Sequence, residues 1–157
     1  MSVQIGKIAP SFSAICDDGS NIELSELRGK NVVLYFYPKD DTPGCTIEAQ
    51  DFTKNIEKFV ALNTVVLGVS RDSIKSHCNF IQKYNLAFNL ISDEDGEICS
   101  AYGVLKEKSM FGKKYLGIDR STFFIDKKGN IAEVWKSVKV NGHVDQILTF
   151  LGKLENQ

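Results

Sequence analysis

Residues 32–37 constrain the fold more than any other part of the chain. They form an unbroken run of valine, leucine, phenylalanine and tyrosine. Such a run is typical of a strand buried on both faces, because a strand with one face in water alternates apolar and polar residues. We therefore place residues 32–37 at the centre of a sheet. Residues 64–70 have the same character and predict a second buried strand beside it.

The segments that follow these strands have the periodicity of helices. Apolar residues between positions 46 and 62 recur at steps of three and four, which predicts one amphipathic helix. We expect a second helix over residues 73–85, capped by Asp72. Its apolar stripe is expected to consist of Ile74, Cys78 and Ile81. Further elements are a strand at residues 88–92, a short helix at 95–102 and a terminal helix at 143–154.

Turn residues mark three hairpins. Asp-Asp-Gly-Ser at residues 17–20 predicts a small opening hairpin, and Asp-Lys-Lys-Gly-Asn at 126–130 predicts another. A third turn lies at residues 109–113, where we interpret the surrounding lysines as a solvated loop. Strand–helix–strand order followed by a hairpin and a helix implies a central mixed α/β sheet with helices on both faces. At this length we expect one domain over residues 1–157.

Composition excludes several classes of function. Lysine and arginine number 19 against 20 aspartates and glutamates, so a nucleic acid or an acidic membrane is not expected as a partner. No apolar run approaches the roughly 18 residues that a membrane helix needs, and no export signal opens the chain. We therefore expect a cytoplasmic protein. The four cysteines form no C-x-x-C pair and have no nearby histidine set, so we expect no metal, disulfide framework or cofactor.

Cys45 lies where the central strand gives way to the first helix. Backbone N–H groups in the first turn of a helix lack partners, and this end of the helix is the positive end of its dipole. Both effects favour the thiolate over the thiol. The sequence therefore predicts a nucleophilic cysteine at this junction.

The residues around Cys45 resemble a known active-site loop. Residues 37–46, Tyr-Pro-Lys-Asp-Asp-Thr-Pro-Gly-Cys-Thr, are similar to the active-site loop of peroxiredoxins. The continuation Glu48-Ala49 and the later stretch Gly-Ile-Asp-Arg-Ser-Thr-Phe-Phe-Ile-Asp at 117–126 resemble the bacterioferritin comigratory, or Q-type, branch. The resemblance extends over almost the whole chain. It implies a thioredoxin-like fold, with the opening hairpin as an N-terminal β-hairpin extension.

The same resemblance implies roles for four residues. Cys45 would be the peroxidatic cysteine, which attacks one oxygen of a hydroperoxide and becomes a sulfenic acid. Arg120 would stabilise the thiolate and the charge on the departing oxygen. Thr42 would donate a hydrogen bond that aligns the peroxide, and Pro38 would border the pocket.

The cysteine that resolves the sulfenic acid is an open question. Many Q-type members carry it five residues after the peroxidatic cysteine, where this chain has Gln50. Another group carries it on the next helix, at the position of Ile81. Cys78 lies one helical turn earlier on the same face, so it is our candidate for the resolving cysteine. We expect Cys16 and Cys99 to be structural, although Cys99 and an external thiol stay open as resolvers.

The implied function is a thiol-dependent peroxidase for hydrogen peroxide and organic hydroperoxides, recycled by thioredoxin or a similar dithiol. The resemblance favours a monomer or weak dimer. The alternatives are a single-cysteine peroxidase that uses an external thiol and a peroxide sensor that passes its oxidation to a partner. A thioredoxin-type oxidoreductase would carry C-x-x-C, and a structural module would not need Cys45 for activity.

Two other features have modest interpretations. His77 and His143 have no partners in the sequence that suggest a ligand set, and we expect neither to be catalytic. Residues 92–96, Ser-Asp-Glu-Asp-Gly, resemble the start of a calcium loop but lack the later ligands. We interpret them as a helix cap.

Overall fold

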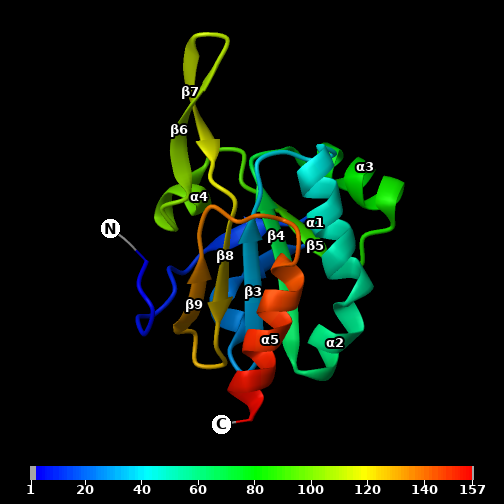
Figure 1. Cartoon of the computed structure of the whole chain (residues 1–157), viewed down its shortest axis with the longest axis vertical. Helices are drawn as coiled ribbons and strands as arrows, with labels where there is room; N and C mark the ends of the chain where they lie inside the picture. Colours follow the sequence, from blue (N-terminus) through cyan, green and yellow to red (C-terminus); the bar gives the residue numbers. More distant parts are fainter. Residues whose placement is uncertain (1–2, 157) are drawn as a thin grey trace.

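The centre of the molecule is a five-stranded mixed sheet, seen in Figure 1 in a computed structural model that describes residues 3–156. Its strand order is β5-β4-β3-β8-β9. The middle strand β3 (Asn31–Phe36) pairs in parallel with β4 (Thr64–Ser70) and antiparallel with β8 (Ser121–Ile125). The outer strands are β5 (Asn89–Ser92) and β9 (Ile131–Trp135). The prediction of a central strand in a mixed sheet is confirmed.

Strand β3 contributes side chains to two hydrophobic cores, because its side chains alternate between the two faces of the sheet. Val32, Leu34 and Phe36 belong to one core, whereas Val33 and Tyr35 belong to the other. All five side chains are almost completely buried. A strand covered on both faces explains why the sequence has no polar residue between positions 32 and 37.

Each core is closed by a different set of elements. The core of Val33 and Tyr35 is covered by four helices, α1 (Pro43–Lys54), α2 (Ile56–Ala61), α3 (Ile74–Tyr84) and α5 (His143–Glu155). The opposite core is covered by the hairpin of β1 (Ser13–Ile15) and β2 (Asn21–Glu23), by the 3₁₀ turn η1 (Leu24–Leu27) and by α4 (Glu97–Ala101). The predicted opening hairpin and helices on both faces are confirmed. Among residues 3–156, no helix is long and apolar enough to cross a membrane.

A second hairpin extends away from the body of the molecule (Figure 1). It consists of β6 (Leu105–Met110) and β7 (Lys113–Ile118), which pair only with each other. Phe111 at its turn has a left-handed backbone and is 97% exposed. The lysines around the turn therefore lie on a solvated hairpin, as expected.

The prediction of one helix over residues 46–62 is wrong. Asn55 interrupts it, with φ −107° and ψ 7°, and ends α1 before α2 begins. The Asn55 side-chain amide donates to the Asp51 carbonyl at 2.8 Å, a local bond by which asparagine competes with helix continuation. Ile47 and Val60, expected on the buried face, are 51% and 67% exposed.

The predicted cap and packing face of the second helix also need correction. Ser73, not Asp72, caps α3, because its hydroxyl accepts from the Ser76 amide at 3.1 Å. The Asp72 carboxylate instead accepts from the amide of Asp40 at 2.9 Å. His77 and Phe80 are the buried residues of α3. The expected stripe of Ile74, Cys78 and Ile81 is only half-buried.

Gly68 gives a test of the packing beneath the helices. A Cβ at this position of β4 would lie 2.7 Å from Leu90 Cδ2 and 3.0 Å from the Tyr35 ring, which is too close for a packed core. We predict that Gly68→Ala lowers the free energy of unfolding by about 1–3 kcal/mol, measured by urea denaturation.

The matched control is Gly152→Ala in α5, where a new Cβ meets nothing within 4 Å. Because alanine favours a helix interior over glycine, this variant should be about 0.5–1 kcal/mol more stable than the parent. Equal effects of the two substitutions would contradict the packing described here.

Candidate active site

Cys45 is the third residue of α1, and its thiol faces the core beneath the helix. Thr42 is the N-cap residue, with an extended backbone, and Pro43 opens the helix. Proline suits this place because its missing N–H would have no helical partner. Cys45 is 1% exposed and packs in the core of Val33 and Tyr35. Cys45 therefore lies in the first turn of the helix that follows the central strand, as expected.

Arg120 brings a positive charge to this thiol from a distant part of the sequence. It directly precedes β8, whose first residue Ser121 pairs with Phe36 at the end of β3. Because β8 runs antiparallel to β3, its start lies beside the loop that leads to Cys45. Arg120 Nη2 donates to Cys45 Sγ at 3.5 Å, and Nη1 donates to Glu48 Oε1 at 2.6 Å.

Glu48 is a site residue that the sequence reasoning did not assign. It lies three residues after Cys45, so both side chains are on the same face of α1, and it is 1% exposed. Burial raises the pKa of Glu48 to about 7, although the charge and hydrogen bond of Arg120 oppose this shift. Its Oε2 has no partner among the described residues. In the sequence, the position of a charged residue on the buried face of a predicted helix could have indicated this role of Glu48.

The arginine remains charged in this setting. Burial alone would lower the pKa of Arg120, but Glu48 and then Cys45 outweigh it and raise the value. Gly44 gives the guanidinium room, since a Cβ there would lie 3.1 Å from Arg120 Nη2. The site therefore has a fixed cation between a carboxylate and a thiol.

The hydroxyl of Thr42 faces the loop rather than the helix. It donates to the Lys39 carbonyl at 2.9 Å, and no side-chain cap is found for α1 within residues 3–156. The amides of Gly44 and Cys45 lie in the first turn, where helical acceptors do not exist. Neither amide therefore has an acceptor within the helix.

Of the predicted site residues, only Cys45 has a hydrogen bond with Arg120 within residues 3–156, and Thr42, Pro38 and Cys78 have none. Pro38 is half-buried in the loop between β3 and α1. Cys78 lies on α3, and its thiol donates to the Asp17 carbonyl of the opening hairpin at 3.1 Å. All four cysteines are free thiols.

The two cysteines expected to be structural are completely buried. Burial, followed by the nearby charges of Asp17 and Asp18, raises the pKa of Cys16 to about 12. Burial and the hydrogen bond to Asp93 raise the pKa of Cys99 still further. Both groups are therefore poor nucleophiles in the folded protein.

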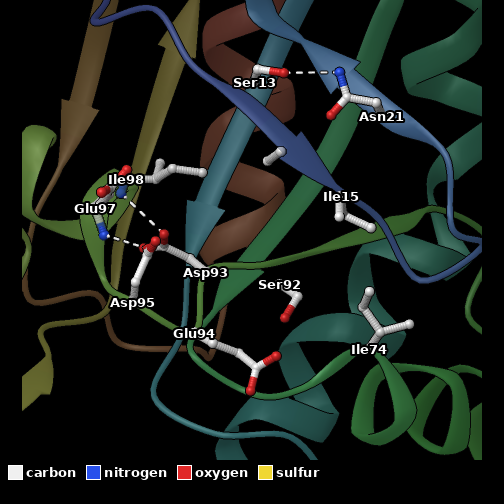
Figure 2. Close-up of a pocket in the computed structure, with 11 residues that line it drawn as sticks. Ser13, Ile15, Asn21, Ile74, Ser92, Asp93, Glu94, Asp95, Glu97 and Ile98 are labelled. Carbon is white, nitrogen blue, oxygen red and sulfur yellow. Dashed lines mark hydrogen bonds between the residues drawn. The ribbon is translucent and has the colours of Figure 1, made fainter.

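A hollow of about 500 Å³ lies on the other face of the sheet, between the opening hairpin, the start of α3 and the segment before α4 (Figure 2). Its acidic side chains are Asp93, Glu94, Asp95 and Glu97. The Asp93 carboxylate accepts from the amides of Ile98 and Cys99 at 3.1 and 2.8 Å. The expected helix cap at residues 92–96 is thus confirmed, although Asp93 is buried, whereas we expect a solvated cap from the sequence.

Three groups could offer ligand atoms to a metal ion. Asp40, Asp72 and His77 have such atoms within 4.8 Å of one another. Each is already engaged, because Asp40 pairs with His77 at 2.7 Å and Asp72 accepts from Ser70 and the Asp40 amide. The arrangement is a hydrogen-bonded network inside the protein.

Comparison with known proteins agrees with this geometry. The AhpC/TSA family model matches residues 5–134. A peroxiredoxin Bcp of Coxiella burnetii is 51% identical over 94% of this chain and 98% of that protein. Peroxiredoxin Bcp of Bacillus subtilis is 47% identical over 96% of each chain.

A solved structure gives the same result. It is that of the bacterioferritin comigratory protein of Xanthomonas campestris, described for its alkyl peroxide reduction activity. It has a TM-score of 0.90 and 42% identity, and the match covers 96% of this chain and 98% of that one. The expected thioredoxin-like fold is therefore confirmed.

The chain belongs to the AhpC/TSA family, and within it to the Bcp, or Q-type, peroxiredoxins. Its activity is that of a thiol-dependent peroxidase, as the sequence predicted.

The raised pKa of Glu48 leads to a prediction about stability. Because the value of about 7 in the folded protein exceeds the ordinary 4.5, folding favours the protonated form. The contribution of Glu48 is complete below about pH 4.5 and is lost as the pH rises to about 7. We predict that the stability of the parent protein, relative to Glu48→Gln, falls by about 1–3 kcal/mol between pH 5 and pH 8.

Urea denaturation of both proteins at the two pH values measures this difference. The exposed neighbour Glu57 is the control, and Glu57→Gln should show a much smaller change. A Glu48→Gln difference that grows with pH in favour of the parent would mean that the ion pair with Arg120 outweighs burial.

Proposed function

We propose that Cys45 is the peroxidatic cysteine of this peroxidase, with Arg120, Thr42 and Pro38 completing the site. The observation that supports this most is the contact of Arg120 Nη2 with Cys45 Sγ at 3.5 Å, at the start of a helix. A guanidinium and unpaired amides both stabilise a thiolate and any anion next to it. The substrates are hydrogen peroxide and organic hydroperoxides.

In the proposed reaction, the Cys45 thiolate attacks the terminal oxygen of the hydroperoxide. An S–O bond forms as the O–O bond breaks, so the cysteine is oxidised to sulfenic acid and the peroxide is reduced. The remaining oxygen leaves as hydroxide or alkoxide and takes up a proton to become water or an alcohol. Arg120 can hold the charge on this oxygen, because it stays protonated.

Thr42 aligns the peroxide by accepting a hydrogen bond from the O–H group of the peroxide. The Thr42 hydroxyl already donates its only hydrogen to the Lys39 carbonyl at 2.9 Å, so its lone pairs are what remains for a ligand. This reverses the direction of the hydrogen bond that the sequence reasoning assumed. The amides of Gly44 and Cys45 then donate to the peroxide oxygens, and Pro38 borders the pocket.

Cys78 is the proposed resolving cysteine. Its thiol would attack the sulfenic acid of Cys45, forming a disulfide and releasing water. The two residues lie on different helices, and Cys78 is held against Asp17 of the opening hairpin. The exchange therefore requires local unwinding of α3. A thioredoxin-like dithiol then reduces the disulfide.

The hydrogen bond between Cys78 and Asp17 also favours a second candidate function. If the Cys78 thiol stays with Asp17, the sulfenic acid is reduced by an external thiol and the enzyme uses a single cysteine. A peroxide sensor is the corresponding function if the oxidised Cys45 reacts with a partner protein instead. We further propose a monomer or weak dimer working in a reducing compartment such as the cytoplasm, with which the free thiols agree.

Replacement of the cysteines tests these assignments. We predict that Cys45→Ser lowers peroxide consumption by at least about a thousandfold, because no other residue supplies the nucleophile. After one equivalent of peroxide, mass spectrometry of the parent should find a Cys45–Cys78 disulfide. The Cys99→Ser variant should form the same bond.

The Cys78→Ser variant should retain fast oxidation of Cys45 and accumulate its sulfenic acid. A Cys45–Cys99 disulfide, or sulfenic acid at Cys45 with all other thiols free in the parent, would assign resolution to Cys99 or to an external thiol. Full activity in Cys45→Ser would remove the proposed site.

A further inference from the structure

His77 is a titratable residue that the proposed mechanism does not use, although it directly precedes Cys78. It is completely buried on α3, and both ring nitrogens have partners. Nδ1 lies 2.7 Å from Asp40 Oδ2, and Nε2 lies 2.9 Å from the Ile91 carbonyl oxygen. A carbonyl can only accept a hydrogen bond, and so can an ionised carboxylate. With Asp40 ionised, this geometry places a proton on both nitrogens, which makes His77 an imidazolium.

The surroundings of Asp40 agree with this charge state. Its Oδ1 accepts from the Tyr37 hydroxyl at 2.6 Å, and Oδ2 also accepts from the Ser76 hydroxyl at 2.8 Å. Two hydroxyl donors besides His77 on one buried carboxyl group favour the carboxylate. Asp40 is only 7% exposed, so an unpaired charge here would be costly and His77 neutralises it.

The charged groups facing His77 act in the same direction. They are Asp40 on the loop before α1 and Asp72 on the loop before α3, and the ring of Tyr37 lies 6.5 Å away. Burial alone would lower the pKa of His77, but the hydrogen bond and charge of Asp40, the Ile91 carbonyl and Asp72 together raise it. The stabilisation by this pair is complete below the ordinary value of 6.5 and is lost as the pH rises through the raised value.

The pair joins α3 to the loop that forms the peroxide site. Asp40 lies between Pro38 and Thr42, and its amide donates to Asp72 at 2.9 Å. The next residue, Asp41, has a left-handed backbone with φ 56°. Such a backbone needs support from its surroundings.

Helix α3 supplies that support to Asp41 as well. Lys83 donates to the Asp41 carboxylate at 2.8 Å and the Tyr84 hydroxyl does so at 2.5 Å. Two successive loop residues are thus held by α3 immediately before the N-cap of α1. Four contacts therefore connect this part of the loop to α3.

We propose that His77 is a positioning residue for peroxide reduction, which through Asp40 fixes the loop of Pro38 and Thr42 and ties the peroxide-reactive shape of that loop to a folded α3. The proposal rests on the proposed function and deepens it. Unwinding of α3, which lets Cys78 reach Cys45, breaks the pair and releases the loop.

The first test is the charge state of the ring. In ¹⁵N-labelled reduced protein at pH 6.5, NMR should show both nitrogens of His77 protonated. A neutral ring at this pH would overturn the proposal. This measurement uses the parent protein and does not depend on how any variant folds.

The second test is rapid-quench kinetics of one turnover, with Cys45 oxidation and disulfide formation followed separately. We expect His77→Gln to slow oxidation at least tenfold without slowing disulfide formation, since the buried carboxylate loses its cation. The added substitution Asp40→Asn removes that unpaired charge, so the double variant should recover at least threefold.

Phe80→Leu is the control for lost packing, because Phe80 is buried on the same helix and has no polar side-chain atom that could hydrogen-bond to Asp40. It should lower stability and leave oxidation within twofold of the parent. Equal slowing in Phe80→Leu, or no recovery in the double variant, would give His77 a merely structural role. Failure of the proposed function is distinct, because the parent itself would then form no sulfenic acid at Cys45.

Discussion

The contact of one guanidinium with two partners organises the whole site. Arg120 holds the Cys45 thiol with one nitrogen and the Glu48 carboxylate with the other, at 3.5 and 2.6 Å. Glu48 is buried, and one of its oxygens has no partner within residues 3–156, a cost that the ion pair with Arg120 offsets only in part. The benefit is geometric, because a guanidinium fixed on one side cannot turn away from the thiol on the other.

The fold supplies this geometry through the order of its strands. The loop that leads to Cys45 and the loop that contains Asp72 follow the parallel strands β3 and β4, so both begin at the carboxyl ends of these strands. Arg120 lies at the same end of β3, because β8 is antiparallel and begins there. Helix α3 then packs against the loop through His77, so the positions of the reactive groups depend on elements from most of the chain.

The sequence contains local information about the site but not its tertiary contacts. The strand before Cys45 and the helix after it follow from the apolar pattern of residues 32–62, whereas Arg120 was assigned only by resemblance. Nothing in a single sequence pairs residue 120 with Glu48, because that contact arises from the insertion of β8 beside β3. The wrong predictions of one continuous helix and of an Asp72 cap also result from contacts that the local pattern does not reveal. Asn55 ends a helix that its neighbours would continue, and Asp72 is drawn from its cap position by the Asp40 amide.

The antiparallel pairing of β8 with β3 has a consequence for the order of events during synthesis. Cys45 and Arg120 are separated by 75 positions in the chain, so the cysteine leaves the ribosome well before its arginine. Until β8 is paired, the thiol lacks the guanidinium that contacts it in the folded protein. A growing chain therefore carries Cys45 without Arg120, and the proposed site exists only after the sheet is complete.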